Sequence, residues 1–233
     1  FGAVFFFAFK QLRHRAAVQV ELAVAGRQLE QSVRRLEQSN ARGKLLARMD
    51  DALQSCASVD EAVASGSKII VLSDRGVDAT HAPIPTLLAI AGVHNHLVRE
   101  KKRTQVGVVI ESGEPREVHH FALLIGYGAS AVNPYLALDS LPRVRDDGYA
   151  VAGLEATEAD EHYLKAIKKG VVKIMSKMGI STVHSYRGAQ IFEAMGLAPE
   201  FIDHYFTKTV SRIGGVGIDT IAQETLYHHE RAF

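Results

Sequence analysis

The chain has 233 residues, of which 47% are apolar and 23% are charged, so it can bury a core without disulfides or bound metals. Its 27 Lys and Arg residues nearly balance its 26 Asp and Glu residues, which argues against the basic surface that binds nucleic acids. The single cysteine, Cys56, excludes an internal disulfide, a thiolate-held iron–sulfur cluster and a cysteine-rich zinc site. It is compatible with the reducing cytoplasm.

Residues 1–9, FGAVFFFAF, form an apolar run that Lys10, Arg13 and Arg15 follow. A membrane-spanning helix needs about 20 apolar residues, so this run cannot cross a bilayer by itself. Its charges also follow the apolar stretch, whereas in a signal peptide they precede it. Two interpretations stay open: the cut end of a membrane helix, with residues 1–15 in contact with lipid, or an apolar terminus that packs on a neighbour.

A helical pattern follows, in which Leu22, Leu29 and Leu36 recur every seven residues. The pattern predicts a short coiled-coil segment or an ordinary amphipathic helix. The next stretch, GKLLARMDDALQSCASVDEA (43–62), resembles the opening helix of a GAF sensor domain in membrane-linked bacterial signalling proteins. We therefore expect residues 1–60 to form a long helical arm, separate from a domain of residues 61–233.

From residue 61 onward, short β-branched runs alternate with helical stretches. The predicted strands are 67–74, 105–112, 129–135 and 180–186. The predicted helices are 83–102, 118–128, 160–178, 187–195, 199–206 and 218–231, and the aperiodic stretch 143–160 is predicted to be a loop. Four alternating units indicate an α/β fold with a parallel sheet, similar to part of a (β/α) barrel.

Polar side chains gather where the predicted strands end, and in parallel α/β folds ligands bind at that edge of the sheet. The candidates are Ser73, Asp74, Arg75, Glu111, Ser185 and Arg187. The alternative is that these groups cap helices and pair with one another, for example Asp74 with Arg75 or Arg187.

A glycine-rich stretch precedes the last predicted helix. Backbone N–H groups at Gly214, Gly215 and Gly217 could cradle a phosphate there, although glycines also serve tight turns. The eleven histidines show no spacing that puts two of them on one helix face, so no metal site is expected.

Four long stretches, at 72–100, 111–141, 169–197 and 206–224, resemble successive blocks of the glutamate synthase large chain. They belong to the central domain of that family, and the resemblance runs in the family's order from about residue 61 to residue 233.

The resemblance implies a domain that connects a glutaminase domain to an FMN synthase domain and helps to form the wall of an ammonia tunnel. The whole family converts glutamine and 2-oxoglutarate into two glutamates, with electrons from NADPH, NADH or ferredoxin. Its catalytic cysteine, its FMN and its iron–sulfur cluster belong to the other domains. We therefore expect no catalytic residue, cofactor or metal in this chain, the other two domains as partners, and self-association when the chain is isolated.

Two other functions stay open at this point. The strand ends and the glycine stretch fit a small βα enzyme that binds a phosphate or FMN. The first 60 residues fit a membrane-linked signalling module, which leaves a natural fusion, a mis-assembled reading frame or a designed chimera as origins of the chain.

Overall fold

The computed structural model describes residues 57–147 and 156–233, so the helical arm predicted for residues 1–60 lies almost wholly outside the described residues. The chain divides into two units, Phe1–Ala47 and Arg48–Phe233, and every described residue belongs to the second. After helical residues 57–64, the elements in chain order are β1 (Ile69–Ser73), α2 (Thr86–Arg99), the 3-10 turn η1 (Arg103–Gln105), β2 (Gly107–Glu111), α3 (Val118–Gly126), β3 (Ala131–Asn133), α4 (Tyr135–Asp146), α5 (Ala156–Lys177), α6 (Val183–Tyr186), β4 (Glu193–Leu197), α7 (Pro199–Tyr205), β5 (Val210–Val216) and α8 (Ile218–Ala232).

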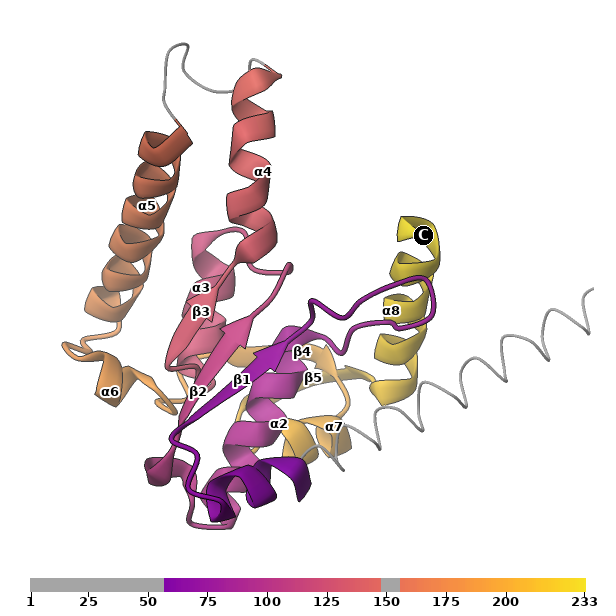
Figure 1. Ribbon diagram of the computed structural model, residues 1–233. Coiled ribbons are helices and arrows are strands. Elements are labelled where there is room, and N and C mark those ends of the chain that lie inside the picture. Colours follow the sequence, from indigo (N-terminus) through magenta and orange to yellow (C-terminus); the bar gives the residue numbers. More distant parts are fainter. Residues whose placement is uncertain (1–56, 148–155) are drawn as a thin grey trace, which may run out of the picture. The chain divides into compact units, whose positions relative to one another are not determined.

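The first three strands form a parallel sheet in the order β1-β2-β3, joined by α2 and α3 (Figure 1). Parallel neighbours need a crossover connection, and the two helices supply it. The predicted α/β class with parallel βα units is confirmed. No helix within the described part of the chain is long and apolar enough to span a membrane.

The two faces of this sheet differ in burial. Val108 and Ile110 of β2 are fully buried, Ile70 of β1 is buried beside them, and they pack with α2 residues such as Ile90 and Leu97. On the other face Ile69 is 66% exposed and Val71 is 55% exposed. The described residues therefore cover one face of the sheet and leave an apolar face open.

A second apolar cluster joins α3, α5 and α6. Phe121 of α3 packs with Ile167 and Val171 of α5 and with Tyr186, which is fully buried and donates its hydroxyl to Ala122 O at 3.1 Å. Ile167, Val171 and Met175 recur at four-residue steps on α5, which explains why this long helix lies along α3.

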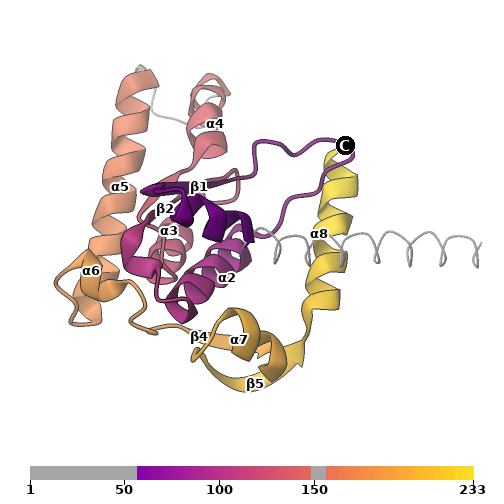
Figure 2. The same ribbon diagram turned by 60° about the horizontal axis from the view of Figure 1, so that its bottom comes forward.

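The remaining strands, β4 and β5, form a separate parallel pair, so the described residues form two small sheets rather than the single sheet that we predicted. Helix α7 connects them and packs on α2, where Asn95 Nδ2 donates to Tyr205 O at 2.9 Å. Figure 2 shows this pair away from the three-stranded sheet, with α8 leading from it to the C-terminus.

Two predictions in this region are wrong. Residues 183–186 are helix α6 and not a strand, because the hydroxyl of Thr182 accepts the backbone N–H of Ser185 and caps a helical turn. The predicted helix 187–195 is instead a turn at 187–188, irregular chain and the start of β4, since Gly188 and Gln190 have positive φ values of 74° and 55° that a helix cannot contain.

The predicted loop 143–160 is also too long, because α4 continues to Asp146 and α5 begins at Ala156. The glycine-rich stretch 211–217, which we considered as a phosphate loop, lies in strand β5 except for Gly217. The β1, β2, β3, α2, α3, α7 and α8 predictions are confirmed, with ends that differ by a few residues.

Gly170 lets α5 approach α3. A Cβ atom added at Gly170 would lie within 3.0 Å of three side-chain atoms of Val118, whereas one added at Gly92 of α2 would meet only Tyr205 Cδ1, at 3.9 Å. Gly170→Ala should therefore lower the free energy of unfolding by about 1–2 kcal/mol, because overpacking outweighs the gain in helix propensity. The control Gly92→Ala should raise it by up to about 1 kcal/mol in the same urea titration. Equal effects of the two substitutions would contradict this role of Gly170.

Candidate functional site

The carboxyl ends of β1, β2 and β3 carry a connected set of polar side chains. The pairing of Ser73 with Glu111 and of Glu111 with Asn133 in the sheet brings these three residues side by side. We call the set formed by Ser73, Asp74, Arg75, Glu111, Ser112, Asn133 and Tyr135 the strand-end network.

One half of the strand-end network surrounds Glu111. Its carboxylate accepts hydrogen bonds from Ser73 Oγ at 2.7 Å, from Arg75 Nε at 2.8 Å and from Asn133 Nδ2 at 3.3 Å. The hydrogen bond from Arg75, followed by that from Ser73, holds the pKa of Glu111 below its ordinary value. Glu111 is therefore a carboxylate at neutral pH, with each of its oxygens engaged.

The other half surrounds Asp74. Its carboxylate accepts hydrogen bonds from Ser112 Oγ at 2.6 Å, from Tyr135 OH at 2.8 Å and from the Gly113 N–H at 3.1 Å. Burial, followed by the hydrogen bond to Asp74, raises the pKa of Tyr135 to about 12, so the phenol stays protonated and keeps donating.

Arg75 joins the two halves. While its Nε bonds Glu111, its guanidinium lies over the Tyr135 ring, with Cζ at 4.1 Å from the ring centroid. The contact adds a cation–π attraction to the ion pair. Ser73, Arg75 and Glu111 thus pair with one another, whereas Asp74 pairs with two hydroxyls and an amide N–H in place of the arginine that the sequence suggested.

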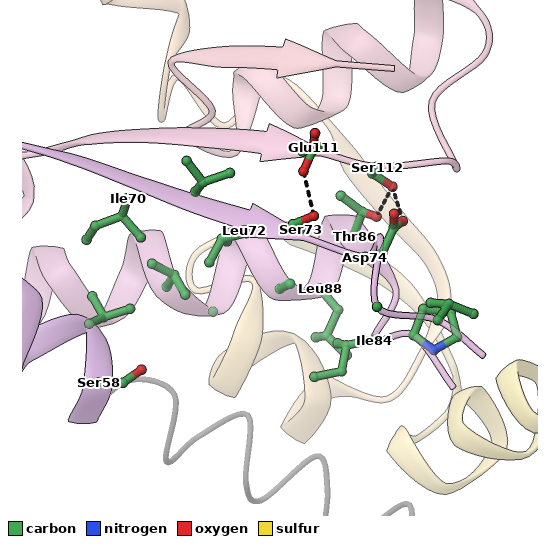
Figure 3. Close-up of a pocket in the computed structure, with 18 of the residues that line it drawn as sticks. Ser58, Ile70, Leu72, Ser73, Asp74, Ile84, Thr86, Leu88, Glu111 and Ser112 are labelled. Atoms are coloured by element: carbon green, nitrogen blue, oxygen red, sulfur yellow. Dashed lines mark hydrogen bonds between the residues drawn. The ribbon is translucent and has the colours of Figure 1, made fainter. Parts of the chain in front are cut away.

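A cavity of about 640 Å³ opens beside β1, between the strand and the start of α2 (Figure 3). Its wall is mainly apolar and includes Ile70, Leu72, Ile84 and Leu88, while Asp74 and other residues of the strand-end network lie at one end. A mainly apolar wall with a few convergent polar groups is typical of small-molecule sites. Sequence reasoning missed this cavity because α2, α7 and the 76–85 loop form it together.

Thr86 was also missed, although it connects α2 to the strand-end network. Its hydroxyl lies 2.7 Å from Ser112 Oγ, and its N–H donates to Glu114 Oε2 at 2.9 Å. Its side chain is buried. The one feature of the sequence that could have pointed to Thr86 was its position directly after Pro85, at the expected start of a helix.

The chemistry open to the strand-end network is limited by its own hydrogen bonds. Asp74 accepts hydrogen bonds from two side chains of the network and from the Gly113 N–H, and Glu111 accepts three within the network, so both carboxylates are already engaged by donors of the fold. Across residues 57–147 and 156–233, no three His, Cys, Asp or Glu side chains come together to hold a metal ion. The arrangement ties together strand ends and the loops that follow them.

Two of the sequence-predicted site residues lie elsewhere. Ser185 belongs to the capped turn α6, and Arg187 directly follows it, with Nη1 3.4 Å from Ser130 Oγ. The reason is that the predicted fourth strand does not exist, so its residues cannot reach the carboxyl edge of the sheet.

The three candidate glycines of a phosphate loop lie in or beside β5. Gly214 and Gly215 are strand residues, and a Cβ at Gly215 would come within 3.0 Å of the Gly196 backbone, which explains the glycine by close strand packing. Gly217 is the residue before α8, and it makes no side-chain cap. The geometry of a strand separates Gly214 and Gly215 from the helix start that would attract a phosphate.

Comparison with known proteins identifies the domain. The glutamate synthase central domain family matches residues 10–198. The chain belongs to this family. The match includes residues 10–60, which we expected to form a separate arm, and the boundary near residue 60 stays a prediction.

Two curated relatives of the glutamate synthase central domain show its place in a longer protein. The large chain of the NADPH glutamate synthase of Bacillus subtilis is 50% identical over 174 residues, which are 75% of this chain and 11% of that protein. The NADH glutamate synthase of Saccharomyces cerevisiae is 45% identical over 179 residues, or 74% of this chain and 8% of that protein. The chain thus spans about a tenth of the length of the curated relatives it matches.

Among solved structures, a flavocytochrome b2 variant with bound benzoylformate aligns with 57% of this chain and 31% of its own, at 16% identity and a TM-score of 0.44.

Asp74 should contribute to stability through its three donors. Asp74→Ala leaves the hydroxyls of Ser112 and Tyr135 and the Gly113 N–H without their acceptor, so we expect the free energy of unfolding to fall by about 1–3 kcal/mol. The control is Asp203→Ala, at an exposed position of α7, which should change it by less than about 0.5 kcal/mol. Chemical denaturation measures both, and an Asp74→Ala protein as stable as the control would refute the assignment.

Glu111 should make stability depend on pH. Because its pKa is lower in the folded chain than its ordinary value of 4.5, its contribution is present above that value and is lost as the pH falls through the folded pKa. Unfolding measured between roughly pH 5 and pH 3 should show a shallower loss of stability for Glu111→Gln than for the unchanged chain. In an Arg75→Met background the same substitution should have a smaller effect, and an unchanged effect would contradict the role of Arg75.

Proposed function

We propose that this chain is the connecting domain of a glutamate synthase, placed between a glutaminase domain and an FMN synthase domain and without catalytic residues of its own. In this proposal the full enzyme makes two glutamates from glutamine and 2-oxoglutarate, and the domain forms part of the wall through which ammonia passes. The full-length relatives, of which the domain is about a tenth, support a role alongside other domains of one protein.

The observation that carries the proposal is the open apolar face of the three-stranded sheet. Parallel sheets are found with both faces covered, yet Ile69 and Val71 are mainly exposed among the described residues. A face of this kind marks a surface that another domain covers. It also explains why we expect the isolated chain to self-associate.

The strand-end network supports a structural role over an independent enzyme. Its two carboxylates are engaged by donors of the same network, and the glycines of the candidate phosphate loop lie in or beside a strand. We assign the iron–sulfur cluster of the family to another domain, because one cysteine cannot ligate a cluster that needs several thiolates. The family resemblance implies the same assignment for the FMN. We also keep the expectation of a cytoplasmic location.

The isolated chain offers the first test. The purified chain should hydrolyse no glutamine, form no glutamate with either glutamine or ammonia as nitrogen donor, and carry no flavin absorbance. Robust activity in either assay, or a bound flavin, would refute the non-catalytic assignment.

The open sheet face offers the second test, in the full-length enzyme. Val71→Lys should lower glutamate formation from glutamine at least tenfold, because an unpaired charge at a covered interface costs more than about 1.4 kcal/mol. Glutamine hydrolysis should persist, since the glutaminase site is in another domain. The control Val98→Lys changes a valine on α2 of similar exposure, 51% against 55%, and should leave both activities unchanged. Equal losses in the two variants would count against a docking role for this face.

A further inference from the structure

Two arginines lie near the amino end of β2, at the opposite end of this strand from the strand-end network. Arg103 belongs to the 3-10 turn before β2, and Arg187 follows α6. Burial, followed by the nearby charge of Arg187, lowers the pKa of Arg103. Like charges at close range repel, so this arrangement calls for a compensating negative group.

Arg103 is held in place by neutral acceptors. Its Nε donates to His94 Nδ1 at 2.9 Å, Nη1 to Val106 O at 2.9 Å and Nη2 to Gly128 O at 2.6 Å. None of these groups carries a negative charge. The guanidinium is thus positioned by the fold, and one further hydrogen on each terminal nitrogen is left for another partner.

Arg187 is less well satisfied. Its Nη1 forms a long hydrogen bond of 3.4 Å to Ser130 Oγ, and its Nε is buried without any hydrogen-bond partner. Nearly all buried polar atoms in folded proteins have a partner, so a buried guanidinium N–H without one points to a missing acceptor. Ser130 Oγ also accepts the Val108 N–H at 3.3 Å, which leaves the Ser130 hydroxyl hydrogen to donate.

His94 stands beside both arginines without supplying a charge. Burial, followed by the charges of Arg103 and Arg187, lowers its pKa to about 4, so the ring is neutral at pH 7. Since Nδ1 accepts from Arg103, the neutral ring carries its hydrogen on Nε2, which makes it a donor as well. Within residues 57–147 and 156–233, neither arginine forms an ion pair with a carboxylate.

We propose that Arg187, Arg103 and Ser130 form a binding site for a small oxyanion, either a phosphate or a carboxylate group. The planar guanidinium offers parallel N–H donors that match two oxygens of such a group, and charge-assisted hydrogen bonds of this kind are the strong ones. The oxyanion would accept the buried Nε hydrogen of Arg187 and offset the charge of both arginines. The site is independent of the connecting role proposed above.

Calorimetry on the full chain tests the site directly. Sodium phosphate and sodium acetate, titrated separately at low ionic strength, distinguish a phosphate site from a carboxylate site. The anion that binds should bind at least tenfold more weakly to Arg187→Gln. The matched control is Arg212→Gln, at an exposed arginine of β5 that contacts Glu193, and it should bind as the unchanged chain does. Heat from neither anion, or equal affinity in the Arg187→Gln variant, would overturn the proposal.

A second measurement follows His94 in the unchanged chain. A bound oxyanion offsets the positive charges that depress the His94 pKa, so that pKa should rise when the binding anion is present. Proton NMR of the ring, assigned with a His94→Gln variant, follows the titration. A His94 titration that is identical with and without each anion would overturn the proposal even where calorimetry shows weak heat.

Discussion

The register of the three-stranded parallel sheet is the constraint on which the rest of the described structure depends. Ile70 pairs with Val108 and Leu72 with Ile110, so these side chains share the face that packs on α2. Burying a residue such as Val108 or Ile110 contributes about 1.5–3 kcal/mol, and a slip of one residue would move all of them into water. The same register places Ser73 beside Glu111. The polar strand ends therefore lie together because the burial of the apolar residues before them fixes the register.

The sheet therefore has one buried face and one open face. The buried face is covered by α2 and α3, whose apolar residues recur at helical spacing and pack against the buried side chains of β1 and β2. The open face keeps Ile69 and Val71 exposed, although β-branched residues on a parallel strand are those that a protein normally covers. In the connecting role proposed above, another domain of the longer protein supplies the layer that covers this face.

Sequence reasoning succeeded where local pattern and tertiary packing agree. β1 and β2 are apolar runs between turn residues, and α5 repeats its apolar residues at three- and four-residue steps, so each could be predicted. It failed at 180–197, where ISTVHSY has the composition of a strand but Thr182 caps a turn. β4 and β5 pair with each other, and a short window of sequence does not show which strands pair with one another.

Only some of the candidate site residues could be predicted from the sequence. Ser73, Asp74, Arg75 and Glu111 could be predicted because each follows or ends a strand whose neighbours were recognised. Arg187 was grouped with them because of a predicted strand that is absent, and its actual neighbours are His94 of α2, Arg103 of η1 and Ser130, which precedes β3. The sequence could not predict that Arg103 and Arg187 lie close together. They are 84 positions apart in the chain, and the packing of α6 on α3 brings them together.

The two ends of the sheet consequently differ in what they can still bind. At the carboxyl end, Asp74 and Glu111 meet hydroxyls, an amide and Arg75, so a ligand would have to displace hydrogen bonds that are already made. At the amino end, Arg187 holds a buried donor with no acceptor beside a second cation, so a ligand would add hydrogen bonds and remove repulsion. Binding free energy is the difference between the bonds formed and those lost. By that criterion the amino end, and not the carboxyl end where α/β folds usually bind, is the end of this domain prepared for an anion.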